Sequence, residues 1–247
     1  MNIIKNYLID SDCYKAGQPL EVKGIMLHSV SCPQQKVVPL HQWNTLSKEV
    51  CTHAYIETGG DVYQTLPWDV RGCHCGSGVN GSANNTHIGI VISAPTTITY
   101  VNGAAFTDRN PPATKAHVLK TYTVAVELFV YLCRRFNLDP AIDGVILSQP
   151  EGNKRGTASN RGNNVEQVWS KFGLTMAQFR ADIRAKLSVF HAPANATSDS
   201  NAPSDWAKTA WYWAMAAEIV TGANPRDTIT CEQAVYMLYH ANKTRFS

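Results

Sequence analysis

The feature that most constrains the fold is a long apolar segment that contains neither proline nor glycine. It covers residues 115–138 and reads KAHVLKTYTVAVELFVYLCRRFNL. Apolar residues occupy most faces of the helix that this segment would form, which predicts a helix inside a core rather than on a surface. We expect the helix to end at Leu138-Asp139-Pro140, because proline disfavours the helical conformation in the residue before it.

Around this helix, short apolar segments predict strands, and one amphipathic segment predicts a further helix. The strand segments are 22–30, 53–57, 61–66, 87–93 and 144–148. Thr58-Gly59-Gly60 separates the second from the third, and glycines that accept a positive φ favour a hairpin there. The amphipathic segment reads MAQFRADIRAKL and follows Thr175, a candidate N-cap. Strands alternating with helices, with a hairpin among them, predict an α/β domain with a mixed sheet flanked by helices.

The chain is expected to contain this domain at 1–190, a linker at 191–204 and a small helical domain at 205–247. The linker reads HAPANATSDSNAPS, which is too polar to bury enough surface to order itself. The tail reads as helix, Gly-Ala-Asn-Pro loop and helix. Trp206, Trp211, Tyr212 and Trp213 crowd its first helix, which predicts burial against the first domain or, in a homo-oligomer, against another copy.

Composition excludes several classes of function. The chain is 44% hydrophobic and 17% charged, and its net charge of +3 is too small and scattered to indicate nucleic-acid binding. The sequence contains no run of about 18 apolar residues, so we expect no membrane span. Lys5 and Asp10 interrupt any apolar core of a signal peptide, and the odd count of seven cysteines favours reduced thiols. We therefore expect synthesis in a cytoplasm.

Four segments, in their order and spacing, resemble the type-2 N-acetylmuramoyl-L-alanine amidases. They read GIMLHSV, THAYIETGGDVYQTLPWDVRGCHCGSG, NNTHIGIVIS and DGVILSQPEGNKRGTASNRG. This family includes phage endolysins and peptidoglycan-recognition proteins, and the likeness is closest to amidases of prophages. It implies a mixed sheet with a groove for the glycan and peptide of bacterial cell wall. It also implies release from the producing cell before the protein acts at the wall.

From Asp205 onward, the tail resembles a single S-layer-homology motif, which elsewhere binds wall polymers. Such motifs use an arginine after Ile-Thr, and Cys231 stands at that position here. The resemblance therefore implies a wall-associated tail without its usual polymer-binding residue.

The resembled enzymes hold zinc on three protein ligands, and zinc activates the water that cleaves the amide. The resemblance places the first ligand at His28 and the other two at Gln149 and Arg161. An amide is a poor zinc ligand, and a guanidinium offers donors only. Val91 stands where relatives often carry a glutamate, and Thr52 stands where some carry a tyrosine. These substitutions predict no confident catalytic residue and no zinc.

The remaining groove positions would still bind a wall peptide or glycan. The resemblance places His53, Trp68 and His74 along the sheet and groove, with Asn85 and Thr86 offering amide and hydroxyl partners. The alternatives are core packing for Trp68 and a turn before a strand for Asn85. We expect Arg161 to fill the vacated metal position, held by Glu151 or by the Gln149 carbonyl, and to bind a carboxylate or carbonyl of a wall peptide.

Three functions therefore stay open. The first is a pseudo-amidase that binds peptidoglycan without hydrolysing it. The second is an active zinc amidase, a phage lysin, whose ligands lie elsewhere; His53, His74 and His87 are the histidines that it would have to recruit. The third is a structural protein that reuses the amidase scaffold for assembly.

Overall fold

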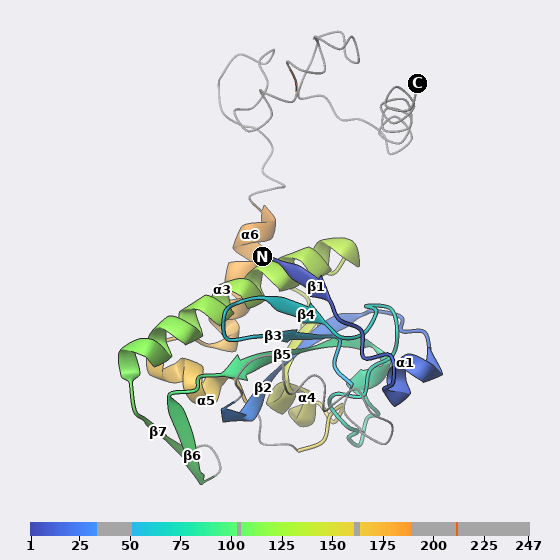
Figure 1. The fold of residues 1–247 in the computed structure, drawn as a ribbon. Coiled ribbons are helices and arrows are strands. Elements are labelled where there is room, and N and C mark those ends of the chain that lie inside the picture. The colour runs from blue at the N-terminus through green and yellow to red at the C-terminus, as the bar shows by residue number, and fades with distance from the viewer. Residues whose placement is uncertain (34–50, 103–104, 161–163, 189–210, 212–247) are drawn as a thin grey trace, which may run out of the picture. The chain divides into compact units, whose positions relative to one another are not determined.

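A six-stranded mixed sheet forms the centre of the first part of the chain in this computed structural model (Figure 1). The strand order is β1-β4-β3-β5-β2-β8, and every neighbouring pair is parallel except β3 and β4. The bounds are β1 (Ile3–Lys5), β2 (Gly24–Pro33), β3 (Ala54–Ile56), β4 (Val62–Gln64), β5 (His87–Ala94) and β8 (Ile146–Ser148). The predicted α/β domain with a mixed sheet flanked by helices is confirmed.

The structure describes residues 1–33, 51–102, 105–160, 164–188 and 211. The chain divides into two units, Met1–His191 and Ala192–Ser247. The predicted linker at 191–204, the helix pair of the tail and its tryptophan-rich first helix lie outside the described residues, apart from Trp211.

The predicted hairpin is confirmed by the pairing of β3 with β4. The two strands are antiparallel, with Ala54 opposite Gln64 and Ile56 opposite Val62. Gly60 in the connecting turn has a φ of 90°, the left-handed conformation for which glycine was expected. A second hairpin, which the sequence analysis did not anticipate, pairs β6 (Ile98–Asn102) with β7 (Ala105–Asp108) in a separate two-stranded sheet.

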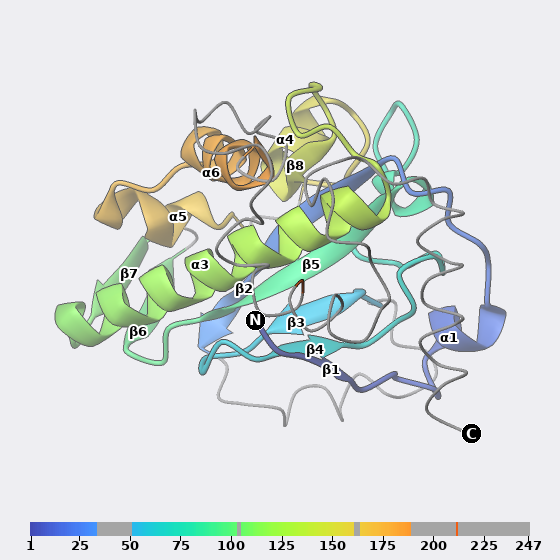
Figure 2. The same cartoon turned by 90° about the horizontal axis from the view of Figure 1, so that it is seen from above.

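The long apolar segment forms α3 (Pro111–Arg135), which crosses one face of the sheet (Figure 2). It begins earlier than predicted, because the Asn110 side chain accepts a hydrogen bond from the Ala113 amide at 3.2 Å. It ends before Leu138, because Asn137 already has a φ of 50° and breaks the helical hydrogen bonds upstream of Pro140. Its length and composition would suit a membrane span, yet most of its apolar stretch is buried inside the fold, as in a core helix.

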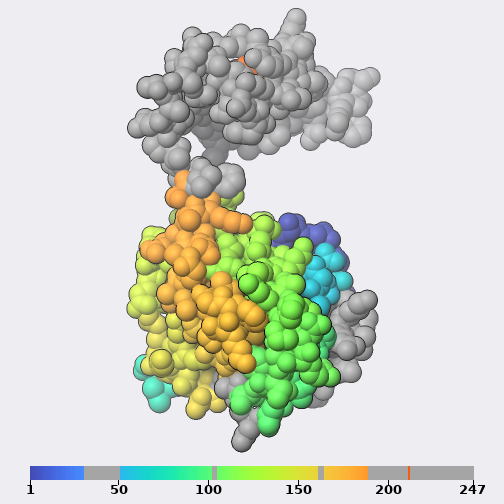
Figure 3. All heavy atoms as spheres, turned by 90° about the vertical axis from the view of Figure 1, so that its left-hand side faces the viewer, coloured from blue at the N-terminus to red at the C-terminus, as the bar shows by residue number. Residues whose placement is uncertain are grey.

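The remaining helices cover both faces of the sheet. α6 (Met176–Ser188) lies beside α3, where the spheres of the two helices touch in Figure 3. Its predicted N-cap is confirmed, because the Thr175 hydroxyl accepts a hydrogen bond from the Gln178 amide at 3.1 Å. α4 (Gln149–Lys154) lies on the opposite face of the sheet from α3 (Figure 1). The short elements are α1 (Asp12–Ala16), η1 (Ala83–Asn85), α5 (Glu166–Trp169) and η2 (Ser170–Phe172).

The main core lies between the sheet and α3, α5 and α6. Alternate residues of β2 and β5, such as Ile25, Leu27 and Ile90, face this core. Phe129 of α3 and Phe179 of α6 are fully buried there, with ring centroids 4.9 Å apart. The intervening residues of the same strands, including Met26, His28 and Gly89, therefore face the other side of the sheet, where the candidate site lies.

Candidate functional site

Three histidine rings lie together on the sheet face opposite α3. His28 comes from β2, His53 immediately precedes β3, and His74 belongs to the segment before η1. The His74 ring lies between the other two, with centroids 5.0 Å from His28 and 5.9 Å from His53. All three side chains are buried. We call these residues the histidine row.

His28 lies within β2, which continues to Pro33, three residues beyond the predicted segment 22–30. Its Nε2 lies 2.9 Å from Nδ1 of His74, and Nε2 of His74 lies 2.9 Å from the carbonyl oxygen of His87. A carbonyl only accepts, so Nε2 of His74 carries a proton. Burial, with the neighbouring His28, lowers the pKa of His74 well below its usual value, so the ring is neutral and its Nδ1 accepts. Nε2 of His28 is therefore the donor and presents no lone pair for a metal.

His53 forms hydrogen bonds through both ring nitrogens within the fold. Its Nδ1 accepts from the Gly89 amide at 2.9 Å, and its Nε2 donates to the Val70 carbonyl at 2.8 Å. Burial lowers the pKa of His53 to about 4, which keeps the ring neutral. These bonds connect β5 to the segment before His74, so His53 has a structural role. Both of its ring nitrogens are used within the fold, and neither is available for the predicted contact with a substrate.

Gly89 makes space for the histidine row. A Cβ at this position would lie 2.3 Å from Cγ of His74, so no larger residue fits beneath the ring. The backbone of His74 is also fixed, because the buried side-chain oxygen of Asn84 accepts hydrogen bonds from the amides of His74 and Cys75, at 2.8 and 3.0 Å. The ring is therefore held against the sheet at Gly89.

The second predicted ligand position, Gln149, is buried at the start of α4. Its amide nitrogen donates to the carbonyls of Cys75 and Ser159, at 3.1 and 2.8 Å. Its Oε1 is buried without a hydrogen-bond partner in the described part of the chain. Gln149 therefore holds two loops together through both of its N–H groups, which is a structural use of this position.

The other positions implied by the resemblance also lack metal-binding chemistry. Val91 lies opposite His28 in the strand pairing and packs with Leu8 and Tyr55. Thr52 is buried, and Arg161 lies outside the described residues. Within the described ranges, no group of three or more histidine, cysteine, aspartate or glutamate side chains is placed to hold a metal ion. The described residues therefore do not fit a zinc site of the resembled kind.

The predicted substrate-binding residues are not gathered in one place. Trp68 is buried in the main core, which agrees with core packing, the alternative given for this residue, rather than with stacking on a sugar. Asn85 accepts a hydrogen bond from Arg71 Nε at 2.7 Å, and the Thr86 hydroxyl lies 2.8 Å from Nδ1 of His87. Asn85 keeps an amide nitrogen for a ligand, whereas Thr86 serves to orient His87.

Glu151 binds partners other than the expected Arg161. Its carboxylate accepts from the Ser148 amide at 2.8 Å and from the Ser148 hydroxyl at 3.0 Å, which caps α4. Arg180 of α6 donates to both carboxylate oxygens, at 3.2 and 3.0 Å. Arg180 could not be identified from the sequence, because no local pattern relates residues 29 positions apart.

The described residues form a hollow at the β8 edge of the sheet, and no histidine of the row lines it. It holds about 320 Å³ and is lined by Glu151 and Arg180 among others. A much smaller cavity of about 20 Å³ lies beside Ser29 and His117. His28 lines neither of the two.

A family model described as N-acetylmuramoyl-L-alanine amidase matches residues 18–160, which is more than half of the chain. No curated protein sequence matches the chain.

Several solved structures are similar. The Staphylococcus aureus hydrolase AmiA, in complex with its ligand, is 12% identical over 77% of this chain and 85% of its own, with a TM-score of 0.56. PlyL is 15% identical over 74% of this chain and 97% of its own, with a TM-score of 0.53. The catalytic domain of XlyA is 18% identical over 74% of this chain and 99% of its own, with a TM-score of 0.52. At these identities the likeness concerns the fold alone.

Proposed function

Since the chain belongs to the N-acetylmuramoyl-L-alanine amidase family, we propose that it engages bacterial peptidoglycan as a pseudo-amidase, which binds the wall polymer without hydrolysing it. The observation that supports this most directly is Gln149. Its two N–H groups are used by the carbonyls of Cys75 and Ser159, so the residue at a ligand position serves as a structural link. A catalytic zinc site needs three protein ligands, and an amide held in this way is not one of them.

The histidine row supports the same proposal. With Nε2 donating to His74, that nitrogen of His28 offers no lone pair to a metal ion. Val91, which lies opposite His28 in the strand pairing, has no carboxylate that could transfer a proton. Of the positions that would carry zinc chemistry, His28, Gln149 and Val91 thus form hydrogen bonds or apolar contacts within the fold. Asn85 and Asn84 keep the loop before β5 in place.

The experiment is elemental analysis of protein purified without chelators, beside a muropeptide-release assay and a pull-down on insoluble cell wall. We expect wall binding, no muropeptide release, and much less than one zinc per chain. One zinc per chain with release of muropeptides would instead establish an active zinc amidase. Absence of wall binding would favour an assembly protein that reuses the scaffold.

A restoration variant sharpens the test. Gln149→His, Arg161→His and Val91→Glu together return the residue types that the family uses at these positions. We expect the triple variant to bind zinc where the wild type does not. Gln149→Leu is the matched control, because it removes the same two hydrogen bonds without adding a metal ligand.

We also infer that the tail at 205–247 associates with another copy of the chain, because the first helix predicted there would carry more aromatic residues than one exposed helix face would hold. Sedimentation of the full chain and of a version ending at residue 190 tests this. If the full chain and the shortened version both sediment as monomers, the inference is wrong.

A further inference from the structure

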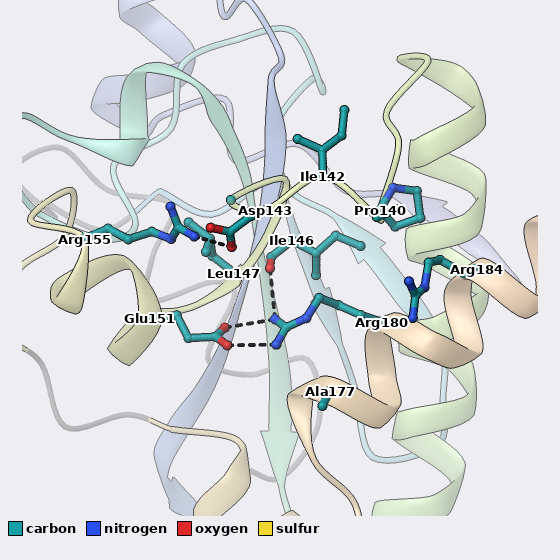
Figure 4. A pocket seen from close by; sticks show the side chains of 12 residues that line it. Pro140, Ile142, Asp143, Ile146, Leu147, Glu151, Arg155, Ala177, Arg180 and Arg184 are labelled. Carbon is teal, nitrogen blue, oxygen red and sulfur yellow. Dashed lines mark hydrogen bonds and ion pairs between the residues drawn. The ribbon is translucent and has the colours of Figure 1, made fainter.

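The hollow at the β8 edge is bounded by both flanking layers of the domain. α4 contributes Glu151, the residue after it contributes Arg155, and α6 contributes Arg180 and Arg184. The loop between α3 and β8 forms the remaining wall, through residues 140–144. Figure 4 shows Arg155 and Arg180 entering from opposite sides.

The ion pair between Arg180 and Glu151 lies along the free edge of β8, where a further strand would otherwise pair. Ile146 and Ser148 are alternate residues of the edge strand, so their backbone groups point in the same direction. The Ile146 carbonyl accepts from Arg180 Nη1 at 3.2 Å, and the Ser148 amide donates to Glu151 at 2.8 Å. Because the Ile146 carbonyl and the Ser148 amide already have hydrogen-bond partners, they are not available to pair with an added strand. A ligand there must be recognised by side chains.

Arg155 is held beside the loop by Asp143, with which it forms an ion pair. A Cβ at Gly144 would lie 3.4 Å from Nη1 of Arg155, so the guanidinium lies directly over this glycine. Gly144 has a φ of 92°, and its carbonyl accepts from Nε2 of His87 at 2.9 Å. The loop beneath Arg155 is therefore fixed in position.

Arg184 differs from the other two arginines of the hollow. It follows Arg180 by one helical turn, and its side chain is exposed. It forms no ion pair or hydrogen bond in the part of the chain that the structure describes. Three guanidinium groups and two carboxylates line the hollow, so it carries a net charge of +1 (3 − 2).

The unused donors belong to separate guanidinium groups. The hydrogen bonds of Arg180 to Ile146 and Glu151 use three of its five N–H groups, which leaves two without a partner among the described residues. Arg184 keeps its whole donor fork. Donors on different groups suit oxygens that diverge from a tetrahedral centre, whereas a carboxylate presents two coplanar oxygens to one fork.

We propose that this hollow binds a phosphodiester group. A phosphodiester carries a single negative charge, which matches the excess of +1, whereas a phosphate monoester carries about −1.5 to −2 at neutral pH. The volume of about 320 Å³ leaves room for the groups on either side of the phosphorus. The proposal goes beyond peptidoglycan binding, because the site is separate from the histidine row and requires no amidase chemistry.

The test is an NMR titration of the full chain with glycerophosphoglycerol, read on the arginine Nε–Hε resonances. Acetate and sodium chloride at matched ionic strength are the reference ligands. We expect saturable shifts at Arg184 and Arg180, with Arg184→Gln weakening the affinity about tenfold. Lys186→Gln is the matched control: it removes one charge from the same helix, at a residue paired with Glu127 rather than facing the hollow, and should change the affinity less than twofold. Both side chains are exposed, so both variants should fold.

A second arm distinguishes the possible sources of the diester. Cosedimentation is measured with phosphatidylglycerol vesicles, and with cell walls that retain or have lost their phosphodiester polymers. Dependence on Arg184 in either arm supports the proposal and identifies the source. If the protein still binds walls that have lost their phosphodiester polymers, that remaining binding is due to the separately proposed peptidoglycan function. The proposal is overturned if acetate binds as tightly as the diester, if both variants lose affinity equally, or if no arm depends on Arg184.

Discussion

The two faces of the central sheet bury their side chains by different means. On the α3 face, Ile25, Leu27 and Ile90 pack against apolar and aromatic side chains of the helices. On the other face, the rings of His28, His53 and His74 lie in a row. His28 and His74 are hydrogen-bonded to each other, and His53 and His74 are hydrogen-bonded to the backbone. The same strands supply both faces through alternate residues.

The difference shows which parts of the fold depend on shape alone. Apolar contacts are non-directional, so the α3 face tolerates exchange among residues of similar volume. Buried polar groups need partners in particular directions, so each histidine depends on a specific acceptor or donor. A metal-binding face can therefore lose its ligand chemistry and remain ordered, provided that the replacing groups form hydrogen bonds of their own, as both N–H groups of Gln149 do.

The largest effect is expected on the apolar face. Phe129→Ala should lower the free energy of unfolding by about 3–5 kcal/mol, because it removes a fully buried ring in contact with Phe179 and leaves a cavity. Urea denaturation measures the change. Leu119→Ala on the same helix is the control, since Leu119 is exposed and should change stability by no more than about 0.5 kcal/mol. Equal losses would show that α3 does not pack as described.

The histidine row should instead make stability depend on pH. Burial lowers the pKa of His53 to about 4 against an ordinary 6.5, with a smaller opposing effect of Asp69. Between these values the unfolded chain binds a proton that the native chain does not, so stability falls as the pH drops from about 6.5 to about 4. One such group contributes about 1.4 kcal/mol per pH unit, or about 3 kcal/mol over the window.

Urea denaturation between pH 4.5 and 7 measures this slope, with His53→Gln as the comparison. The variant keeps an amide donor and acceptor beside Val70 and Gly89 but does not titrate. We expect its slope to be shallower by up to one proton. A slope identical to that of the wild type would contradict the neutral, buried state of His53. Half-buried His87 and His117, whose pKa values desolvation also lowers, titrate in both proteins and cancel in the comparison.

A double-mutant cycle tests whether the row is packed as tightly as the α3 face. Gly89→Ala should cost about 1–3 kcal/mol, because the new Cβ would lie 2.3 Å from His74 Cγ while both ring nitrogens of His74 are held. In a His74→Ala background the same change should cost much less. If the losses of stability from Gly89→Ala and His74→Ala are additive, the cost of the new Cβ does not come from contact with the His74 ring.

The sequence predicted the sheet strands of this fold well where the pattern was local. The hairpin of β3 and β4 followed from alternating residues around Thr58-Gly59-Gly60, and the N-cap of α6 followed from Thr175. The end of α3 was misplaced, because a left-handed asparagine ends a helix without the composition signal that proline gives.

The site was less predictable, because its contacts join residues that are far apart in the chain. The likeness to a family indicated that His28 and Gln149 share a site. It could not show that Nε2 of His28 would donate a hydrogen bond to His74. It also placed Trp68 at the groove, although burial in the core depends on the packing of distant segments. Long-range pairs such as Glu151 and Arg180 have no spacing rule in the sequence.

The smallest effect is expected where the two faces meet, at the edge strand β8. Glu151 belongs to α4 on the histidine side and Arg180 to α6 on the apolar side, so their ion pair joins the two layers. Glu151→Gln should cost about 1 kcal/mol at neutral pH, because an amide still accepts from the Ser148 N–H but no longer offers Arg180 two anionic oxygens.

The pH dependence of this change separates it from that of His53. Burial alone would raise the pKa of Glu151, but the hydrogen bonds and charge of Arg180, with the bonds from Ser148, hold it below the usual 4.5. The stabilisation is therefore present above that pH and is lost as the pH falls through the lower native value. We expect the difference between wild type and Glu151→Gln to be largest at pH 7 and to close in acid, below the window in which His53 titrates. Asp143→Asn, at the exposed pair with Arg155, should show a smaller difference at pH 7. A Glu151 effect that does not change with pH, or that Asp143→Asn equals, would mean that the edge pair does not hold the two layers together.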